Sequence, residues 1–158
     1  ALTLKGGKGE VTKSFLHPKI ACSLAGDEMV FSAARYSKSE KKMINTFKAH
    51  IRNMIKGVSE GHLYKLRVCS GHFPMNVSVK GARLEVKNFI GEAVPRQLEF
   101  KEGVDVKLNG DIIQVSGVNK ELTAQAAASI EQLTRRNGFD RRVFQDGIYI
   151  IEKDGKAI

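Results

Sequence analysis

Residues 104–153 read VDVKLNGDIIQVSGVNKELTAQAAASIEQLTRRNGFDRRVFQDGIYIIEK. Two short runs of alternating polar and apolar residues meet at Asn109-Gly110, a pair typical of a β-hairpin turn. Asn119 is a suitable N-cap for the helix-periodic segment that follows. A basic loop then leads to a last strand-like run that begins at Gly147. The stretch therefore predicts a hairpin, a helix and a final strand.

The same plan occurs earlier in the chain. Residues 24–32 (LAGDEMVFS) match residues 108–116 (LNGDIIQVS), a helix-periodic segment follows, and GHLY at 61–64 corresponds to GIY at 147–149. An internal repeat of this kind indicates two copies of one small structural unit. We therefore predict an α+β fold with two tandem similar domains, each an antiparallel sheet with one packed helix. The predicted domains are residues 1–70 and 71–158.

The two copies do not begin at the same point of the repeat. Residues 84–92 (LEVKNFIGE) match residues 2–10 (LTLKGGKGE), and a strand over 73–80 is expected to pair back across Gly81. That pairing strand has no counterpart before Leu2. We therefore expect the first copy to have a further strand upstream of Ala1.

Both expected helices have an apolar face. The first is expected to begin at Ser39 as N-cap, and the second matches its apolar spacing with Leu122, Ala126, Ile130 and Leu133. A stripe of this composition is more typical of a core than of a partner groove. The expected core positions of the first helix are Met43, Ile44, Phe47, Ile51, Met54, Ile55 and Val58.

The charge of the chain indicates a polyanionic partner. The 158 residues carry a formal net charge of +9, and the first 70 residues hold 13 Lys and Arg against 5 Asp and Glu. Such an excess favours nucleic acid before a membrane surface. No apolar run approaches the length of a membrane-spanning helix, so no membrane partner is expected.

Cys22 and Cys69 lie in strand-like runs and are expected to be buried thiols in a reducing compartment. The tail after Lys153 is expected to be mobile.

Three basic features are candidates for RNA contact. Lys8 lies in a Gly-rich turn, but Gly9 stands where a nucleotide-binding P-loop would have Ser or Thr, so a hairpin tip touching an RNA backbone is the better interpretation. Lys41, Asn45, Lys48, Arg52 and Lys56 form a stripe on the first helix, which is either a solvated face or a phosphate-facing one. Residues 135–142 contain four Arg, whose planar guanidinium groups suit phosphate.

Catalytic and metal-binding motifs are not found in the sequence. The His residues at 17, 50, 62 and 72 lack metal-ligand spacing, and no nucleophile or zinc-protease motif occurs. We therefore expect no enzyme activity, metal, cofactor or small-molecule substrate.

Four blocks of the sequence together resemble one known family. They are residues 45–58 (NTFKAHIRNMIKGV), 72–74 (HFP), 88–92 (NFIGE) and 142–150 (RVFQDGIYI). In these blocks the chain is similar to the large-subunit ribosomal protein L six family. The similarity is to its archaeal and eukaryotic branch, in which the eukaryotic members are called L nine, and it covers essentially the whole chain.

The resemblance implies a structural constituent of the large ribosomal subunit in the cytoplasm. Its partners would be large-subunit rRNA, near the sarcin–ricin loop and the elongation-factor site, and neighbouring ribosomal proteins. A free-standing RNA-binding module or assembly factor is the alternative, and a small enzyme that uses His is a third hypothesis. The resemblance and the basic features together give the following expected RNA-binding residues: Lys5, Lys8, Lys48, Arg52, Lys56, Lys87, Asn88, Gly91, Arg96, Arg135, Arg136, Arg141, Arg142 and Lys153.

Overall fold

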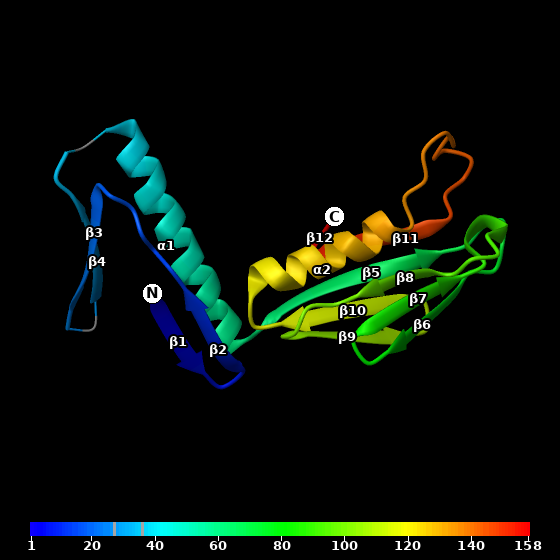
Figure 1. Ribbon diagram of the computed structural model, residues 1–158, viewed down its shortest axis with the longest axis horizontal. Coiled ribbons are helices and arrows are strands. Elements are labelled where there is room, and N and C mark those ends of the chain that lie inside the picture. Colours follow the sequence, from blue (N-terminus) through cyan, green and yellow to red (C-terminus); the bar gives the residue numbers. More distant parts are fainter. Residues whose placement is uncertain (27, 36) are drawn as a thin grey trace. The chain divides into compact units, whose positions relative to one another are not determined.

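The computed structural model describes residues 1–26, 28–35 and 37–158. The chain forms two compact units, Ala1–Glu60 and Gly61–Ile158, and each combines antiparallel strands with one α-helix. The predicted α+β fold is therefore confirmed (Figure 1).

The first unit contains two β-hairpins. Strands β1 (Leu2–Gly6) and β2 (Gly9–Lys13) pair around the Gly-rich turn. Strands β3 (Ile20–Ala25) and β4 (Glu28–Ala33) pair with Ile20 opposite Ala33. The expected Gly26-Asp27 turn includes Asp27, which lies outside the described residues. Both hairpins thus form where the alternating runs predicted them.

Helix α1 (Lys38–Ser59) follows β4 and is capped by Ser37, two residues before the predicted cap. The Ser37 hydroxyl accepts a hydrogen bond from the Ser39 backbone N–H at 3.2 Å and donates one to the Glu40 carboxylate. A Ser followed three residues later by Glu is a typical sequence signal for the N-terminus of a helix, which explains why Ser37 and not Ser39 is the N-cap. The hydrogen bond from Ser37 is the main cause that lowers the pKa of Glu40.

Phe47 is the centre of the small core of the first unit. The centre of its ring lies 5.3 Å from the ring centre of Phe15, which precedes β3, and 5.7 Å from the ring centre of Phe31, which is in β4. Phe47, Met54 and Val58 are buried as predicted, whereas Ile55 is 53% exposed. The predicted apolar stripe is wider than the face that the two hairpins cover.

The second unit has two sheets. Strands β12 (Lys156–Ala157), β11 (Gly147–Lys153), β5 (His62–Cys69), β10 (Ile112–Gly117) and β9 (Val104–Asn109) form the larger one in this order. Strands β6 (Asn76–Lys80), β7 (Arg83–Lys87) and β8 (Arg96–Glu99) form the smaller one. The loop between β9 and β10 consists of Gly110 and Asp111, and Gly110 has a φ of +59°, the conformation for which glycine is favoured.

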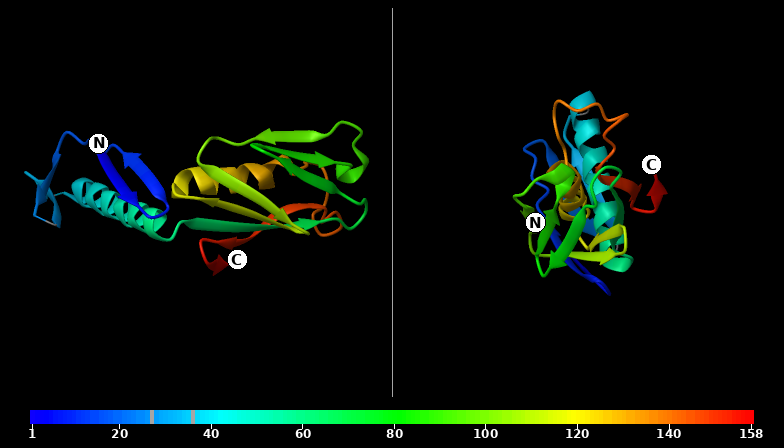
Figure 2. Two further views of the ribbon diagram at one scale, coloured as in Figure 1. Left: turned by 90° about the horizontal axis from the view of Figure 1, so that it is seen from below. Right: turned by 90° about the vertical axis from the view of Figure 1, so that its right-hand side faces the viewer.

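Helix α2 (Lys120–Leu133) packs on strands of both sheets (Figure 2). Asn119 caps it as predicted, by accepting a hydrogen bond from the Glu121 N–H at 3.0 Å. Ala126, Ala127 and Ile130 are buried on its inner face, and the small Ala side chains let the helix approach closely. The core of this unit also contains fully buried side chains from both sheets, namely Leu66, Leu84, Val86, Ile113, Val115 and Ile148.

Strand β5 determines where the chain divides. It is hydrogen-bonded to β10 on one side and to β11 on the other, so it is an interior strand of the second unit. The compact units therefore divide between Glu60 and Gly61, ten residues before the boundary expected from the repeat. The repeat pattern identified β5 as the counterpart of β11, and the structure pairs these two equivalent strands with each other.

Two smaller expectations are wrong. Cys22 is exposed, because residues 21–25 of the two-stranded β3–β4 hairpin are exposed on both faces of the strand. Cys69, the last residue of β5, is half-buried. The tail after Lys153 turns back at Asp154-Gly155, and β12 pairs with the end of β11. The Asp154 carboxylate also accepts a hydrogen bond from the buried His62 ring at 3.0 Å, which anchors this turn.

Candidate nucleic-acid interface

Two of the predicted RNA-binding segments meet at one end of the second unit. Residues 87–92 begin at the last residue of β7, and residues 134–146 connect α2 to β11 (Figures 1 and 2). Phe89 and Ile90 of the first segment line the same cavity as Arg135, Arg136 and Arg141 of the second. We call the surface formed by residues 87–92 and 134–146 the loop end.

Arg96, at the start of β8, joins the two segments of the loop end. Its guanidinium group donates to both carboxylate oxygens of Glu92, at 2.7 and 2.8 Å, and lies 4.5 Å from the centre of the Phe89 ring. It also donates to the Leu133 carbonyl at 2.6 Å and the Arg135 carbonyl at 3.3 Å. These carbonyls are at the C-terminus of α2, where helix carbonyls lack partners within the helix. Arg96 thus fixes the point at which the arginine-rich loop leaves the helix.

The charge of Arg96 also acts on its carboxylate partner. The hydrogen bonds from Arg96 are the main cause that lowers the pKa of Glu92, and the nearby charge of Arg136 lowers it further. The salt bridge between Arg96 and Glu92 is partly buried on both sides. We infer that Arg96 acts mainly as a positioning residue for the loop end.

The backbone of residues 88–91 is unusual. Asn88 and Ile90 have φ values of +57° and +48°, and Gly91 has +75°. A β-branched residue such as Ile90 seldom adopts positive φ, and strain of this type is often found at functional sites. The Asn88 side-chain N–H₂ donates to the Pro74 carbonyl at 3.0 Å, so this predicted contact residue also holds the neighbouring loop.

Asp146 anchors the other side of the arginine-rich loop. One carboxylate oxygen accepts hydrogen bonds from the backbone N–H of Gly71 at 2.7 Å and of His72 at 3.0 Å. The other oxygen accepts from His72 Nδ1 at 2.6 Å. Burial alone would raise the pKa of Asp146, but these hydrogen bonds outweigh it and lower the pKa to about 2. Asp146 therefore remains ionised at neutral pH although its side chain is buried.

The predicted arginines of the loop have two different surroundings. Arg135, Arg136 and Arg141 are exposed residues that line a cavity of about 220 Å³. Arg142 instead makes an exposed salt bridge at 2.9 Å to Asp140, whose pKa is lowered mainly by that hydrogen bond. Gly138, at the tip of the loop, has a φ of +83°, so glycine is needed there for its conformation.

Lys87 and Lys153 differ in position. Lys87 lies at the end of β7 next to Asn88 and makes a 3.4 Å salt bridge to Glu85. Lys153 is the last residue of β11, whereas the arginine-rich loop joins β11 at Gly147. An extended strand rises about 3.3 Å per residue. Lys153 is therefore at the far end of β11 and does not belong to the loop end.

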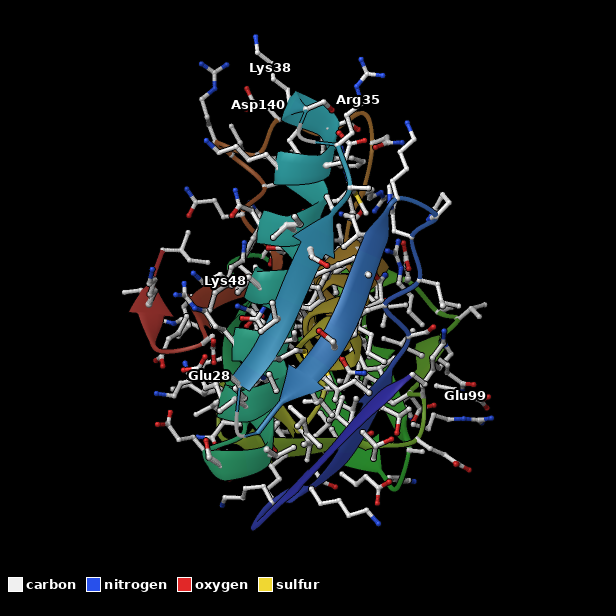
Figure 3. All side chains as sticks on the ribbon, turned by 90° about the vertical axis from the view of Figure 1, so that its left-hand side faces the viewer. Glu28, Arg35, Lys38, Lys48, Glu99 and Asp140 are labelled. Atoms are coloured by element: carbon white, nitrogen blue, oxygen red, sulfur yellow. The ribbon has the colours of Figure 1, made fainter. Side chains whose placement is uncertain are left out.

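The remaining predicted contact residues belong to the first unit. Lys48 and Arg52 are exposed on α1 and Lys56 is half-buried one turn further on; Figure 3 shows Lys48 along the helix and Lys38 and Arg35 near its start. Lys5 makes a 3.1 Å salt bridge to Glu10 across the β1–β2 hairpin. An RNA-contact role for these residues stays a prediction.

The Gly-rich turn that carries Lys8 has a packing role in the first unit. A Cβ atom at Gly6 would lie 2.6 Å from the Val58 carbonyl oxygen, so glycine is required there for close approach. The Lys8 backbone N–H donates to the same carbonyl at 3.0 Å. The turn therefore caps the C-terminal end of α1, and the Lys8 side chain remains exposed.

Three aromatic residues that line the cavity of the loop end were not among the predicted site residues. Phe139, Phe144 and Tyr149 line the cavity together with the arginines. Their signal in the sequence is the alternation of aromatic and basic residues over 135–149, a composition common in RNA-binding surfaces. Local spacing alone does not show that these rings converge, because their meeting depends on the long-range anchor at Asp146.

Within residues 1–26, 28–35 and 37–158, no group of three or more His, Cys, Asp or Glu side chains is placed to hold a metal ion. Over the same described part of the chain, no helix is both long and apolar enough to span a membrane.

Comparison with known proteins identifies the family. The profile described as "Ribosomal protein L6" matches residues 1–61 and 73–147. "Large ribosomal subunit protein uL6" of Methanococcus vannielii is 44% identical over 157 residues, which is 99% of this chain and 86% of that protein. The protein of the same name from Methanosarcina mazei is 45% identical over 151 residues, covering 96% of this chain and 86% of that protein. The resemblance predicted from the sequence is therefore confirmed, and the chain belongs to the ribosomal protein L6 family.

Proposed function

We propose that the chain is a structural constituent of the large ribosomal subunit and binds large-subunit rRNA. Membership of the family supports the ribosomal role, because both relatives are named as large ribosomal subunit proteins. The family resemblance extends the proposal to rRNA near the sarcin–ricin loop and the elongation-factor site. The chain would act in the cytoplasmic ribosome, with neighbouring ribosomal proteins as further partners and without catalysis.

The observation that carries the proposed RNA contact is the cluster of arginines at the loop end. Arg135, Arg136 and Arg141 are exposed around one cavity, in a loop held at one side by Arg96 and at the other by Asp146. Because the loop is anchored at both sides, little conformational entropy is lost when RNA binds. Preformed positive charge at the end of a folded unit is what an RNA backbone of defined shape requires.

The physical mechanism is neutralisation of phosphates with release of counterions. Each guanidinium group can bind a phosphate through two parallel hydrogen bonds. Every phosphate contact adds to the dependence of affinity on salt concentration. Double-stranded rRNA would be recognised by its shape, its phosphates and its 2′-hydroxyl groups. The protein would thereby hold RNA segments in place.

Replacement of the four arginines tests the location of the contact. We expect the variant with Arg135, Arg136, Arg141 and Arg142 changed to Ala to bind large-subunit rRNA more weakly. The slope of log K against log salt should also become shallower by roughly 0.7–0.9 for each phosphate that the variant no longer neutralises. Affinity measured over a salt series gives both quantities.

The matched control for this experiment is Arg83→Ala. Arg83 lies at the other end of β7 from the loop end and pairs with Glu99 on the adjacent strand. Its replacement should leave the salt slope unchanged. If the four-arginine variant keeps the slope of the unmodified chain, the phosphate contacts lie elsewhere, and the basic stripe on α1 becomes the next candidate.

Co-sedimentation distinguishes a ribosomal constituent from a free-standing RNA-binding module or assembly factor. A constituent should remain with purified large subunits after a high-salt wash, because many contacts hold it. An assembly factor should bind precursor particles and be absent from finished subunits. Loss of the protein from washed mature subunits would therefore contradict the proposed role while leaving RNA binding intact.

A further inference from the structure

The cavity at the loop end is lined by aromatic rings, which phosphate binding does not need. Its volume is about 220 Å³, and its lining combines the rings of Phe139, Phe144 and Tyr149 with arginine side chains. Pockets for drug-sized ligands have volumes of roughly 300–1,000 Å³. The smaller size and the aromatic lining suit a single planar ring system.

The rings of the cavity are held in a fixed arrangement. The Phe139 and Phe144 rings are perpendicular, with centroids 4.9 Å apart. Phe144 also stacks on His72 at 4.9 Å, and His72 is fixed in turn by Asp146. The Arg136 guanidinium group lies 4.2 Å from the centre of the Phe139 ring. Aromatic faces and guanidinium planes are the two surfaces on which unpaired RNA bases stack.

The lining of the cavity carries charges of both signs. Asp146 and Glu131 both contribute to the lining, and Asp146 is ionised at neutral pH. Arg135, Arg136 and Arg141 line the same cavity, so charge alone does not select its occupant, and the aromatic rings are the feature that favours a base. Gln132, which also lines the cavity, has an amide that can donate to and accept from the edge of a base. The exposed arginines are then available to the phosphates on either side of that nucleotide.

We propose that the cavity takes one unstacked nucleobase of large-subunit rRNA, with Phe139 as its stacking surface. The proposal rests on the proposed rRNA-binding function and adds to it a dependence on a single base. Because stacking is neutral in charge, this interaction contributes affinity without changing the salt dependence, which separates it from the arginine contacts.

The first test replaces Phe139 in the full chain. Phe139→Leu keeps an apolar side chain but removes the flat ring. We expect roughly a 5- to 150-fold loss of affinity for large-subunit rRNA at every salt concentration, the range that corresponds to stacking of one base. The slope of log K against log salt should not change. Phe139→Tyr keeps the ring and should bind like the unmodified chain.

The second test changes the RNA. Base-specific chemical probing of large-subunit rRNA, with and without the unmodified chain, should identify one unpaired nucleotide whose base becomes protected. Removal of that base alone, as an abasic nucleotide, should weaken binding as much as Phe139→Leu does. Combining the two changes should cause no further loss, because both remove the same interaction. This test uses the unmodified protein as well, so it remains decisive if Phe139→Leu fails to fold.

Other outcomes would overturn the proposal. Unchanged affinity of Phe139→Leu, or additive losses in the combined experiment, would show that no base occupies the cavity. Normal binding of Phe139→Leu to free rRNA together with loss from assembled subunits would assign the cavity to a side chain of a neighbouring protein. In each of these cases a reduced salt slope of the four-arginine variant would still support rRNA binding. If the four-arginine variant keeps the salt slope while Phe139→Leu shows the expected loss of affinity, the cavity still binds a base but the phosphate contacts lie outside the loop end.

Discussion

Asp146 is the residue that connects the stability of the second unit to the shape of its loop end. Its buried carboxylate accepts three hydrogen bonds from Gly71 and His72, which lie far from it in sequence. These bonds close residues 134–146 back onto the end of β5 and orient the His72 ring that supports Phe144. A single ionised side chain therefore positions both the backbone of the loop and the aromatic lining of the cavity.

Asp146→Asn should lower the stability of the second unit. The amide cannot accept at both of its polar atoms, so the set of hydrogen bonds is incomplete, and we expect a loss of about 1–3 kcal/mol at pH 7. Urea unfolding of the chain, followed by circular dichroism, measures this difference. Asp105→Asn is the control, because Asp105 is exposed on β9 and its replacement should change stability by less than about 0.5 kcal/mol.

The stability that Asp146 contributes should depend on pH. Its pKa in the folded chain is about 2, and the ordinary pKa of aspartate is about 3.9. A pKa that is lowered by folding contributes stability above the unfolded pKa and loses it as pH falls towards the folded pKa. The difference in stability between the unmodified chain and Asp146→Asn should therefore shrink as pH is lowered from about 4 to 2. A difference that stays constant over this range would show that the carboxylate charge has no such role.

Among the elements, the C-terminus of α2 and residues 88–92 are joined through Arg96. Its five N–H groups in a planar fork can serve Glu92 and the carbonyls of the helix end together, and a lysine ammonium group cannot reproduce this geometry. Loss of the fork would leave the Leu133 and Arg135 carbonyls without this partner. The start of the arginine-rich loop would then become more mobile.

Arg96→Lys separates a positioning role from an RNA contact. We expect a loss of stability of about 1–3 kcal/mol and faster hydrogen exchange of the backbone amides in residues 134–146. The variant keeps its charge, so the salt slope of rRNA binding should stay the same. Arg83→Lys affects only exposed interactions, with Glu99 and Gln97, and should change neither the stability nor the hydrogen exchange. Normal exchange together with weaker RNA binding would identify Arg96 as a direct contact.

Element by element, the sequence predicts secondary structure better than it predicts how loops meet. The alternating runs, the Gly110 turn and the Asn119 cap are local signals, and the structure confirms each of them. The cap of α1 lies at Ser37 because Glu40 supports it, a competition between two nearby serines that composition alone does not decide. The cavity of the loop end depends on Arg96 and Asp146 reaching across long sequence separations, for which no local pattern exists.

At the scale of the whole molecule, the division of the chain has a direct test. The fragment 61–158 includes β5, whereas the fragment 71–158 follows the boundary expected from the repeat and lacks it. We expect the longer fragment to fold cooperatively, because 98 residues with their own core are enough for an independent domain. The shorter fragment should fail to fold, since β10 and β11 would lose their common neighbour and Leu66 would be missing from the core.

Urea unfolding followed by circular dichroism distinguishes the two fragments. A sharp transition for residues 61–158 and none for residues 71–158 is the expected result. If residues 71–158 unfold as cooperatively as the longer fragment, β5 is dispensable and the repeat boundary describes the folding unit better. Binding of large-subunit rRNA by the longer fragment would further show that the loop end acts without the first unit.

The position of β5 between β10 and β11 also sets an order of events during synthesis of the chain. β5 is among the first segments of the second unit to be made, whereas one of its two neighbours, β11, begins only at Gly147. Contacts between distant segments form slowly, and unpaired strand edges are exposed in the meantime. Until β11 has left the ribosome, β5 has an open edge and the arginine-rich loop has only one fixed side. The loop end can therefore take its final form only after β11 has been made.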